Sequence, residues 1–362
     1  MSLRTGQLLL ILVAAVLAAC AKRSEPAPAP LGQLRYEPIA IGSFSDGPNV
    51  SWGTFAFDLN ESGAVTGSSW GRAFLWTEET GLEDLGGLPG AEGSYAHGIN
   101  DSGQVVGGSG ERAFLWSAAG GMRDLGALPG MVSEALAINA AGEIVGYNSS
   151  EGLARATRWK AGGEMADMGF FGAAHDVSDS GAIVGEIHVQ PLPRRAFLWT
   201  EKGGVKQLDD LPGGEESGVA NAINNKGQAV GESVVGEAAV AGAPGATTTL
   251  SHAVLWTPGS AAKDLGVLPD AAGPLIQSAA YDINDLGRVV GDSSSGGLIH
   301  AFVWDARNGM ADLNDLVDWP QTAAPPPELM GATAINNKGE ILVYARDGAA
   351  HSAYLLRPKS EE

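Results

Sequence analysis

Short apolar strands separated by polar turns fill most of the chain, and one such pattern recurs seven times. A strand ending in Asn or Ser leads into a tight turn with Gly, and a second apolar strand follows. The copies are AFDLNESGAVTGSS (56–69), AHGINDSGQVVGGS (96–109), ALAINAAGEIVGYN (135–148), AHDVSDSGAIVGEI (174–187), ANAINNKGQAVGES (220–233), AYDINDLGRVVGDS (280–293) and ATAINNKGEILVYA (332–345). The turn is typical of a hairpin in which Gly takes a positive φ. We number the stretches that these copies begin as units 1 to 7.

Two further strands complete each unit. An AFLW-type strand occupies 73–76, 113–116, 156–159, 196–199, 253–256, 301–304 and 353–356. A charged strand around Asp-Leu-Gly follows it in six units, but unit 7 has none because the chain ends soon after residue 356. A similar stretch, residues 36–42, precedes unit 1 instead. The turn glycines lie 39 to 60 residues apart, and a period near 40 with four strands is typical of a propeller blade.

The pattern predicts an all-β fold, a seven-bladed β-propeller with four-stranded blades. We letter the strands a to d from axis to rim. Strands b and c are apolar on consecutive residues, so both of their faces should be buried, whereas the charged strand d should be outermost. Residues 36–42 would pair with 353–356 and close the ring, because a blade that lacks a strand leaves an open edge. A linear β-solenoid, which needs no such exchange, is the alternative.

The N-terminus has the features of an export signal. An apolar run from Leu8 to Ala18 follows Arg4 and is too short to span a bilayer. It ends in Leu-Ala-Ala-Cys, which resembles the bacterial lipobox, and that resemblance implies cleavage before Cys20 and lipidation of this only cysteine. Ala21 then favours the outer membrane if the source is Gram-negative, or the plasma membrane if it is Gram-positive. The alternative is an ordinary secretory signal.

Four segments follow from these features. They are a signal peptide (1–19), a lipidated Cys with an Ala/Pro-rich tether (20–34), the seven-unit propeller (35–358) and a tail (359–362). The chain has 362 residues, 52 of them Gly, and a formal net charge of −20. An acidic surface argues against nucleic acid, whose affinity depends on Lys and Arg contacts to phosphate. We expect a monomer attached to a membrane.

The repeated motifs resemble the HAF family of probable extracellular repeats. His300-Ala301-Phe302 is the fullest instance of the family's signature, and the resemblance covers about residues 55–357. Unit 3 (ATRW) and unit 7 (AYLL, with Val343 where others have Gly) depart from it. The resemblance implies a location at the cell surface and no particular reaction.

Two repeated features could bind ions. The residue before the AFLW-type strand is basic in six units: Arg72, Arg112, Arg155, Arg195, His252 and His300. These could form an anion site, but we favour a structural ring paired with the Asp of strand d. The turns at 58–63, 176–181 and 282–287 faintly resemble calcium loops, although the first Asp is missing from the other four copies. We predict Asx-type turns there and no metal.

Function is expected where the repeat is interrupted. Insertions at 186–195, 232–252, 267–279 and 314–331 all belong to units 4 to 7 and to connections on one face. Trp319 is the strongest candidate binding residue, followed by Arg194, His188 and Glu215. Neither HExxH nor CxxC occurs, and we predict no catalytic residue and no cofactor. The sequence therefore favours a non-enzymatic lipoprotein that binds a protein or glycan, with an extracytoplasmic hydrolase or lyase as the alternative.

Overall fold

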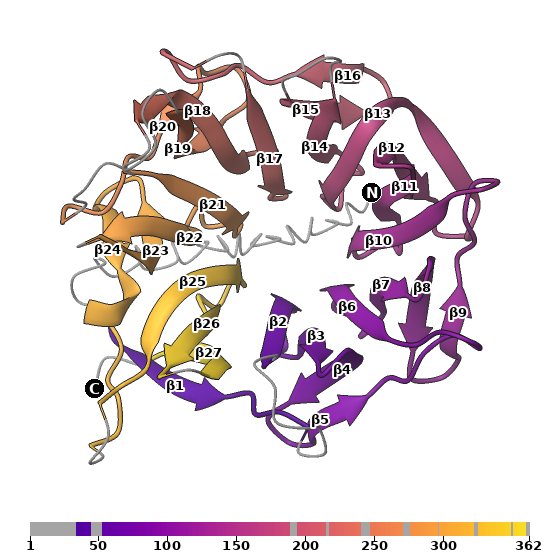
Figure 1. The fold of residues 1–362 in the computed structure, drawn as a ribbon, viewed down its shortest axis with the longest axis horizontal. Coiled ribbons are helices and arrows are strands. Elements are labelled where there is room, and N and C mark those ends of the chain that lie inside the picture. The colour runs from indigo at the N-terminus through magenta and orange to yellow at the C-terminus, as the bar shows by residue number, and fades with distance from the viewer. Residues whose placement is uncertain are drawn as a thin grey trace, which may run out of the picture.

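The structure is a computed structural model that describes residues 34–44, 53–188, 194–214, 217–239, 247–270, 276–295, 297–321, 325–348 and 350–359. These residues form an all-β fold of antiparallel sheets arranged around a central axis (Figure 1). No helix in the described part of the chain is long and apolar enough to cross a membrane.

Strands a to d follow one another in each unit, with a innermost and d at the rim (Figure 1). Unit 1 contains β2 (Thr54–Leu59), β3 (Val65–Ser69), β4 (Arg72–Thr77) and β5 (Gly81–Asp84). Unit 2 contains β6 (Ser94–Ile99), β7 (Val105–Ser109), β8 (Arg112–Ser117) and β9 (Gly121–Asp124). Unit 5 contains β17 (Gly218–Ile223), β18 (Ala229–Ala239), β19 (Thr247–Trp256) and β20 (Lys263–Asp264). Unit 6 contains β21 (Ser278–Ile283), β22 (Val289–Ser295), β23 (Leu298–Asp305) and β24 (Gly309–Asp312), and a 3-10 helix at Leu313–Asp315 follows it.

Units 3 and 4 share one long strand, which the repeat did not predict. Their strands are β10 (Val132–Ile138), β11 (Ile144–Ser150), β12 (Leu153–Trp159), β13 (Met165–Val177), β14 (Ile183–His188), β15 (Arg194–Thr200) and β16 (Gly204–Gln207). Strand β13 pairs with β12 as far as Phe171 and with β14 from Gly172 onward. The two units therefore form one seven-stranded sheet beside five four-stranded sheets.

The two ends of the described chain meet in unit 7. Its strands are β25 (Glu328–Ile335), β26 (Ile341–Asp347), β27 (Ala350–Pro358) and β1 (Tyr36–Ala40). Strand β1 pairs antiparallel with β27, from Tyr36 opposite Pro358 to Ala40 opposite Tyr354. The stretch before unit 1 therefore supplies the strand that unit 7 lacks, and Tyr36 is fully buried there.

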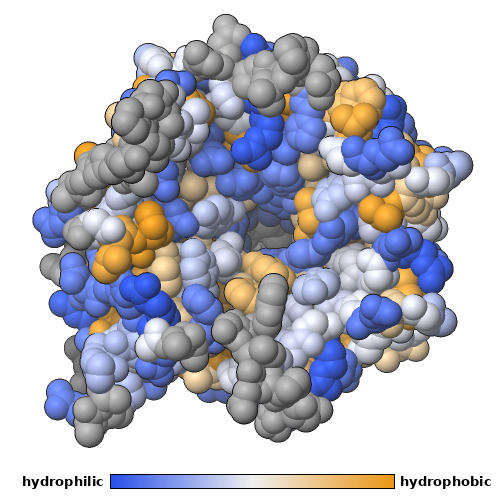
Figure 2. All heavy atoms as spheres, in the orientation of Figure 1, coloured by the Kyte–Doolittle hydropathy of each residue, from blue (hydrophilic) through white to orange (hydrophobic). Residues whose placement is uncertain are grey.

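The core is divided into clusters between neighbouring units. Strands β3 and β7 are buried at every residue, as predicted for strand b. A typical cluster joins Val106 of unit 2 to Ile138, Ile144 and Trp159 of unit 3. An equivalent cluster packs Leu342 and Leu355 of unit 7 against Phe74 and Trp76 of unit 1. Seen from the side shown in Figure 1, the surface is hollowed at its centre and mostly hydrophilic around the hollow (Figure 2).

Candidate functional site

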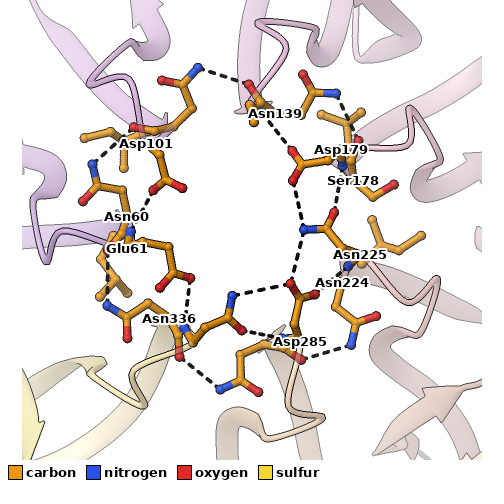
Figure 3. A pocket seen from close by; sticks show the side chains of 18 of the residues that line it. Asn60, Glu61, Asp101, Asn139, Ser178, Asp179, Asn224, Asn225, Asp285 and Asn336 are labelled. Atoms are coloured by element: carbon orange, nitrogen blue, oxygen red, sulfur yellow. Dashed lines mark hydrogen bonds between the residues drawn. The ribbon is translucent and has the colours of Figure 1, made fainter. Parts of the chain in front are cut away.

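The seven tight turns, six of them Asn-x-x-Gly and one Ser-x-x-Gly, gather at one end of the axis, which we call the turn end. Three residues from each turn line a cavity of about 190 Å³ (Figure 3). The turn glycines adopt a positive φ, for example 82° at Gly63, and the Oδ1 atom of Asn60 accepts hydrogen bonds from the backbone N–H groups of Ser62 and Ala64. These are Asx-type turns, in which the side chain fixes the hairpin.

A ring of hydrogen bonds links these turns from unit to unit. The Asn side chain at the end of strand a donates through Nδ2 to the backbone carbonyl of its equivalent in the next unit, at 3.0–3.2 Å (Figure 3). The donors are Asn60, Asn100, Asn139, Asn224, Asn284 and Asn336. The bond from Asn336 of unit 7 reaches Asn60 of unit 1. Unit 4 lacks the bond because Ser178, which stands in place of Asn, has no amide to donate.

A second ring lies one residue further along each turn. The backbone N–H of this residue donates to the side-chain oxygen of its equivalent in the next unit at 2.8–3.0 Å. The acceptors are Asp101, Asp179, Asn225, Asp285, Asn337 and Glu61. Unit 3 has Ala140 at this position and offers no acceptor. Most of the polar side chains around the cavity are therefore used in joining adjacent units.

Three half-buried carboxylates lie deeper along the axis. Asp58, Asp176 and Asp282 each accept the N–H of the Ile that ends strand a in the next unit, at 2.7–2.9 Å. Burial raises the pKa of Asp58 to about 7, that of Asp176 to about 6 and that of Asp282 to about 8, against the opposing effect of these hydrogen bonds. The described residues contain no group of three or more His, Cys, Asp or Glu placed to hold a metal ion.

The opposite end of the axis, where strand a begins and strand b ends, we call the loop end. Here, in each unit, one residue of strand a lies directly opposite one residue of strand b. The two side chains of such a pair therefore share a face of the sheet. From unit 1 to unit 7 the pairs are Phe55–Ser68, Tyr95–Gly108, Glu134–Tyr147, Ala173–Glu186, Val219–Glu232, Ala279–Asp292 and Gly331–Tyr344. These pairs change from aromatic to acidic around the ring while the strands carrying them stay the same.

Units 1 and 2 form the aromatic half of the loop end. The side chains of Phe55 and Tyr95 lie opposite the small residues Ser68 and Gly108. Phe55 is 38% exposed and Tyr95 is 48% exposed. Two large rings therefore stand open to solvent beside the axis, at a place where the repeat does not require them.

Units 4 and 5 carry carboxylates at the same position of strand b. Glu186 accepts hydrogen bonds from His188 at 2.8 Å and from Arg194 at 3.1 Å. Burial raises the pKa of Glu232, although the charge of Arg194 and a hydrogen bond from Ser251 oppose the rise.

Unit 6 holds its carboxylate between two phenols. Asp292 accepts a hydrogen bond from the Tyr281 hydroxyl at 2.8 Å, and Tyr344 of unit 7 also bonds to it. Burial raises the pKa of Asp292 to about 6, and the charge of Glu232 contributes. Gly331 makes room for the Tyr344 ring, because a Cβ at this position would lie 2.3 Å from a ring carbon. We call Glu186, Glu232 and Asp292, with the two tyrosines, the acidic half.

Unit 3 lies between the two halves and combines both kinds of side chain. Glu134 bonds to His97 of unit 2 at 2.7 Å and to the hydroxyl of Tyr147. Burial raises the pKa of Glu134, but these two hydrogen bonds and the charge of His97 outweigh it and lower the pKa. The His97 ring packs on Phe57 of unit 1 with ring centroids 5.2 Å apart.

The structure brings together only two of the four predicted binding residues. His188 and Arg194 both contact Glu186. Trp319 instead lies against the outer strands of unit 7, where it packs edge-on against Tyr354 and lines a pocket of about 570 Å³ with Pro38 and Pro327. Glu215 and the proposed lipidation site Cys20 lie outside the described residues.

The basic residues before strand c mostly pair with the Asp of strand d in the same unit. The pairs are Arg72–Asp84, Arg112–Asp124, Arg155–Asp167, His252–Asp264 and His300–Asp312, at 2.5–3.1 Å. Unit 4 places Gln207 where the others have Asp, opposite the strand that carries Arg195. The predicted ring of basic residues is thus a set of local ion pairs within single units, near the rim.

A motif of serine hydrolases lies at the end of β3. Residues 67–71, Gly-Ser-Ser-Trp-Gly, match the G-x-S-x-G pattern of serine hydrolases. The pattern requires a Ser exposed on a strand-to-helix turn, but Ser69 is fully buried at the end of β3 and bonds to Thr54 at 3.0 Å. It cannot act as a nucleophile in this position.

Sequence reasoning also missed Glu186, Glu232, Asp292, Tyr281 and Tyr344. The available signal was the residue after the Gly of strand b, which is Ser68, Gly108, Tyr147, Glu186, Glu232 and Asp292 in units 1 to 6. A position that varies inside an otherwise constant repeat points to a role outside the repeat.

No family model matches the chain, and no curated protein matches it. Similar solved structures include a streptogramin B lyase, with a TM-score of 0.55 and 12% identity over 92% of this chain and 100% of that chain. Virginiamycin B lyase from Staphylococcus aureus has a TM-score of 0.53 and 11% identity over 89% and 99%. Oligogalacturonate lyase in complex with manganese has a TM-score of 0.50 and 13% identity over 90% and 97%. At such identities the likeness establishes a propeller-like fold alone.

Proposed function

We propose that the chain is a lipid-anchored, seven-bladed propeller that binds a glycan at its loop end. The count of seven treats the seven-stranded sheet as two blades that share β13, a division supported by the separate pairing of β13 with β12 and β14. Closure of the ring is supported by the β1–β27 pairing and by the bond from Asn336 to Asn60. The HAF-type repeats and the signal ending at Cys20 support a place at the cell envelope.

One observation carries the assignment of the loop end. The cross-strand pairs there differ in every unit, while six of the seven turns at the other end share one hydrogen-bonding pattern. Side chains needed only for packing would be the same in every unit. Variation on a fixed frame is how binding residues are usually presented.

A glycan fits the kinds of side chain present. Exposed aromatic rings such as Tyr95 offer flat apolar surfaces on which the C–H face of a sugar can pack. Carboxylates such as Asp292 and Glu232 accept hydrogen bonds from hydroxyl groups. Raised pKa values at these two carboxylates also favour a second candidate, a hydrolase or lyase that uses them as proton donors.

The test is titration of the full chain in detergent with chitohexaose, the hexamer of N-acetylglucosamine, by isothermal calorimetry. We expect saturable binding that Phe55→Ala and Tyr95→Ala together weaken at least tenfold. Ser62→Ala at the turn end is the matched control and should leave affinity unchanged. Loss of binding in the Ser62→Ala control alone would show that the glycan binds at the turn end and would contradict the proposal. Shortening of the hexamer during the titration would favour the enzyme.

Anchoring is tested separately. Cys20→Ser should abolish labelling of the protein by a fatty-acid analogue and release the protein from the membrane fraction. Unchanged labelling would refute the lipoprotein part of the proposal and leave the binding part intact.

A further inference from the structure

We infer that the glycan bound at the loop end carries protonated amines, as glucosamine oligomers do. This inference rests on the proposed function and adds the charge of the ligand to it. Its basis is that the loop end is divided into an aromatic half in units 1 and 2 and an acidic half in units 4 to 6.

The acidic half has more negative charge than its own cations neutralise. Glu186 is paired with both His188 and Arg194. Among the residues that the structure describes, Glu232 and Asp292 form no ion pair, and their hydrogen bonds come from Ser251 and the two phenols. Two further charges act on Glu232, namely Arg194, which is engaged with Glu186, and Glu186 itself, which adds repulsion.

Two carboxylates that are partly buried and repel each other are costly as anions. A neutral sugar would bury them further without a compensating charge, and an acidic sugar would add repulsion. A ligand ammonium would lower that cost, and the adjacent Tyr281 and Tyr344 rings can also attract a cation. The net charge of −20 should in addition speed the approach of a polycation.

The aromatic half explains why the ligand should be a sugar rather than a simple polyamine. Phe55 and Tyr95 are 38% and 48% exposed, in adjacent units across the axis from the carboxylates. An aliphatic polyamine has no flat face to cover such rings. An amino sugar has an apolar C–H face on one side and charged amines at its edge, which matches the two halves.

The deciding experiment compares two hexamers that differ only in charge. The full chain in detergent is titrated with the glucosamine hexamer and with chitohexaose at pH 6 and low salt. We expect the glucosamine hexamer to bind at least tenfold more tightly, and the preference to fall as salt is added. In the double variant Glu232→Gln/Asp292→Asn the preference should shrink to threefold or less, because the variant loses more affinity for the glucosamine hexamer than for chitohexaose.

The control double variant, Glu79→Gln/Glu83→Gln, removes the same charge from the exposed outer part of unit 1. It should keep the preference. A preference lost equally in both double variants would mean non-specific attraction of a polycation and would overturn the inference. Equal affinity of the wild-type protein for both hexamers would overturn it while leaving the glycan proposal intact. Spermine competing as well as the glucosamine hexamer would replace the sugar by a polyamine.

Discussion

The two ends of the axis are built from the same inner strands, but their side chains differ in how regularly they repeat from unit to unit. At the turn end, six of the seven units repeat one arrangement, in which the Asn ending strand a bonds to its neighbour's backbone. At the loop end, the corresponding positions run from Phe55 through Glu134 to Asp292 with no common partner. Repetition at one end joins the units, and variation at the other leaves room for recognition.

The buried carboxylates at the two places differ in their hydrogen-bond partners. The axial Asp58, Asp176 and Asp282 each bond to backbone N–H groups of the next unit, so they hold the structure together. Asp292 bonds to two phenols, and burial raises its pKa, with a contribution from the charge of Glu232. Substitutions should therefore affect stability at the turn end and affinity at the loop end.

The largest loss of stability should follow from removing β1. Deletion of residues 35–43 takes away the strand paired with β27 and the fully buried Tyr36, whose truncation alone would cost about 3–5 kcal/mol. We expect unit 7 to unfold first, followed by loss of contacts at both ends of the axis. Urea unfolding followed by circular dichroism measures the effect. A midpoint equal to the parent's would argue against closure through this strand.

A smaller loss is expected from Asn336→Ala. The side chain of Asn336 donates to Asn60 and accepts from Lys338 and Glu340, so its removal should lower the free energy of unfolding by about 2–3 kcal/mol. Asp292→Asn at the loop end keeps one accepting oxygen and should cost less than about 1 kcal/mol. Equal losses would remove the distinction between the two ends.

Stability should also depend on pH through the axial carboxylates. The pKa values of Asp58 and Asp282 are raised to about 7 and 8 in the folded protein, so the folded state holds more protons than the unfolded chain between about pH 4 and 8. The free energy of unfolding should therefore fall as pH rises through this window. Asp282→Asn should flatten the profile of melting temperature against pH, at the cost of one hydrogen bond. A profile that rises across the window would reverse this assignment.

The smallest change repairs the gap in the Asn ring. Ser178→Asn gives unit 4 an amide that can donate to the backbone carbonyl of Asn224, where the other turns have such a bond. We expect stabilisation of about 0.5–1 kcal/mol, measured as a raised urea midpoint, with glycan affinity unchanged. A loss of affinity would mean that the gap at unit 4 serves binding.

Much of the fold could be predicted because the sequence pattern within each unit predicts the strands of that unit. The Asn-x-x-Gly turn fixes the hairpin, and the missing strand d of unit 7 points to Tyr36–Ala40 as its substitute. The shared β13 was missed because the spacing of turn glycines around it is ordinary. Units 1 and 2 have a Pro-Gly loop after strand d, whereas unit 3 passes from Met168 to Ala173 without one, so the strand continues through Gly172.

The candidate site was harder to predict because it is assembled across units. Glu232 comes from unit 5, Asp292 from unit 6 and Tyr344 from unit 7, with more than 50 residues between successive members. Their proximity depends on the arrangement of the units around the axis and on the alternation of side chains in strand b. Insertion length directed attention to Trp319, which lies on the outer strands of unit 7.

The shared strand also limits where the chain can be cut. In most units a loop separates strand d from the next strand a, so joining residue 359 to residue 34 and opening such a loop would give a circular permutant with all strands intact. Between units 3 and 4 the same operation would sever β13 itself, at residues paired with both β12 and β14. Permutants opened after Asp84 or Asp124 should fold, whereas one opened at Gly172 should not.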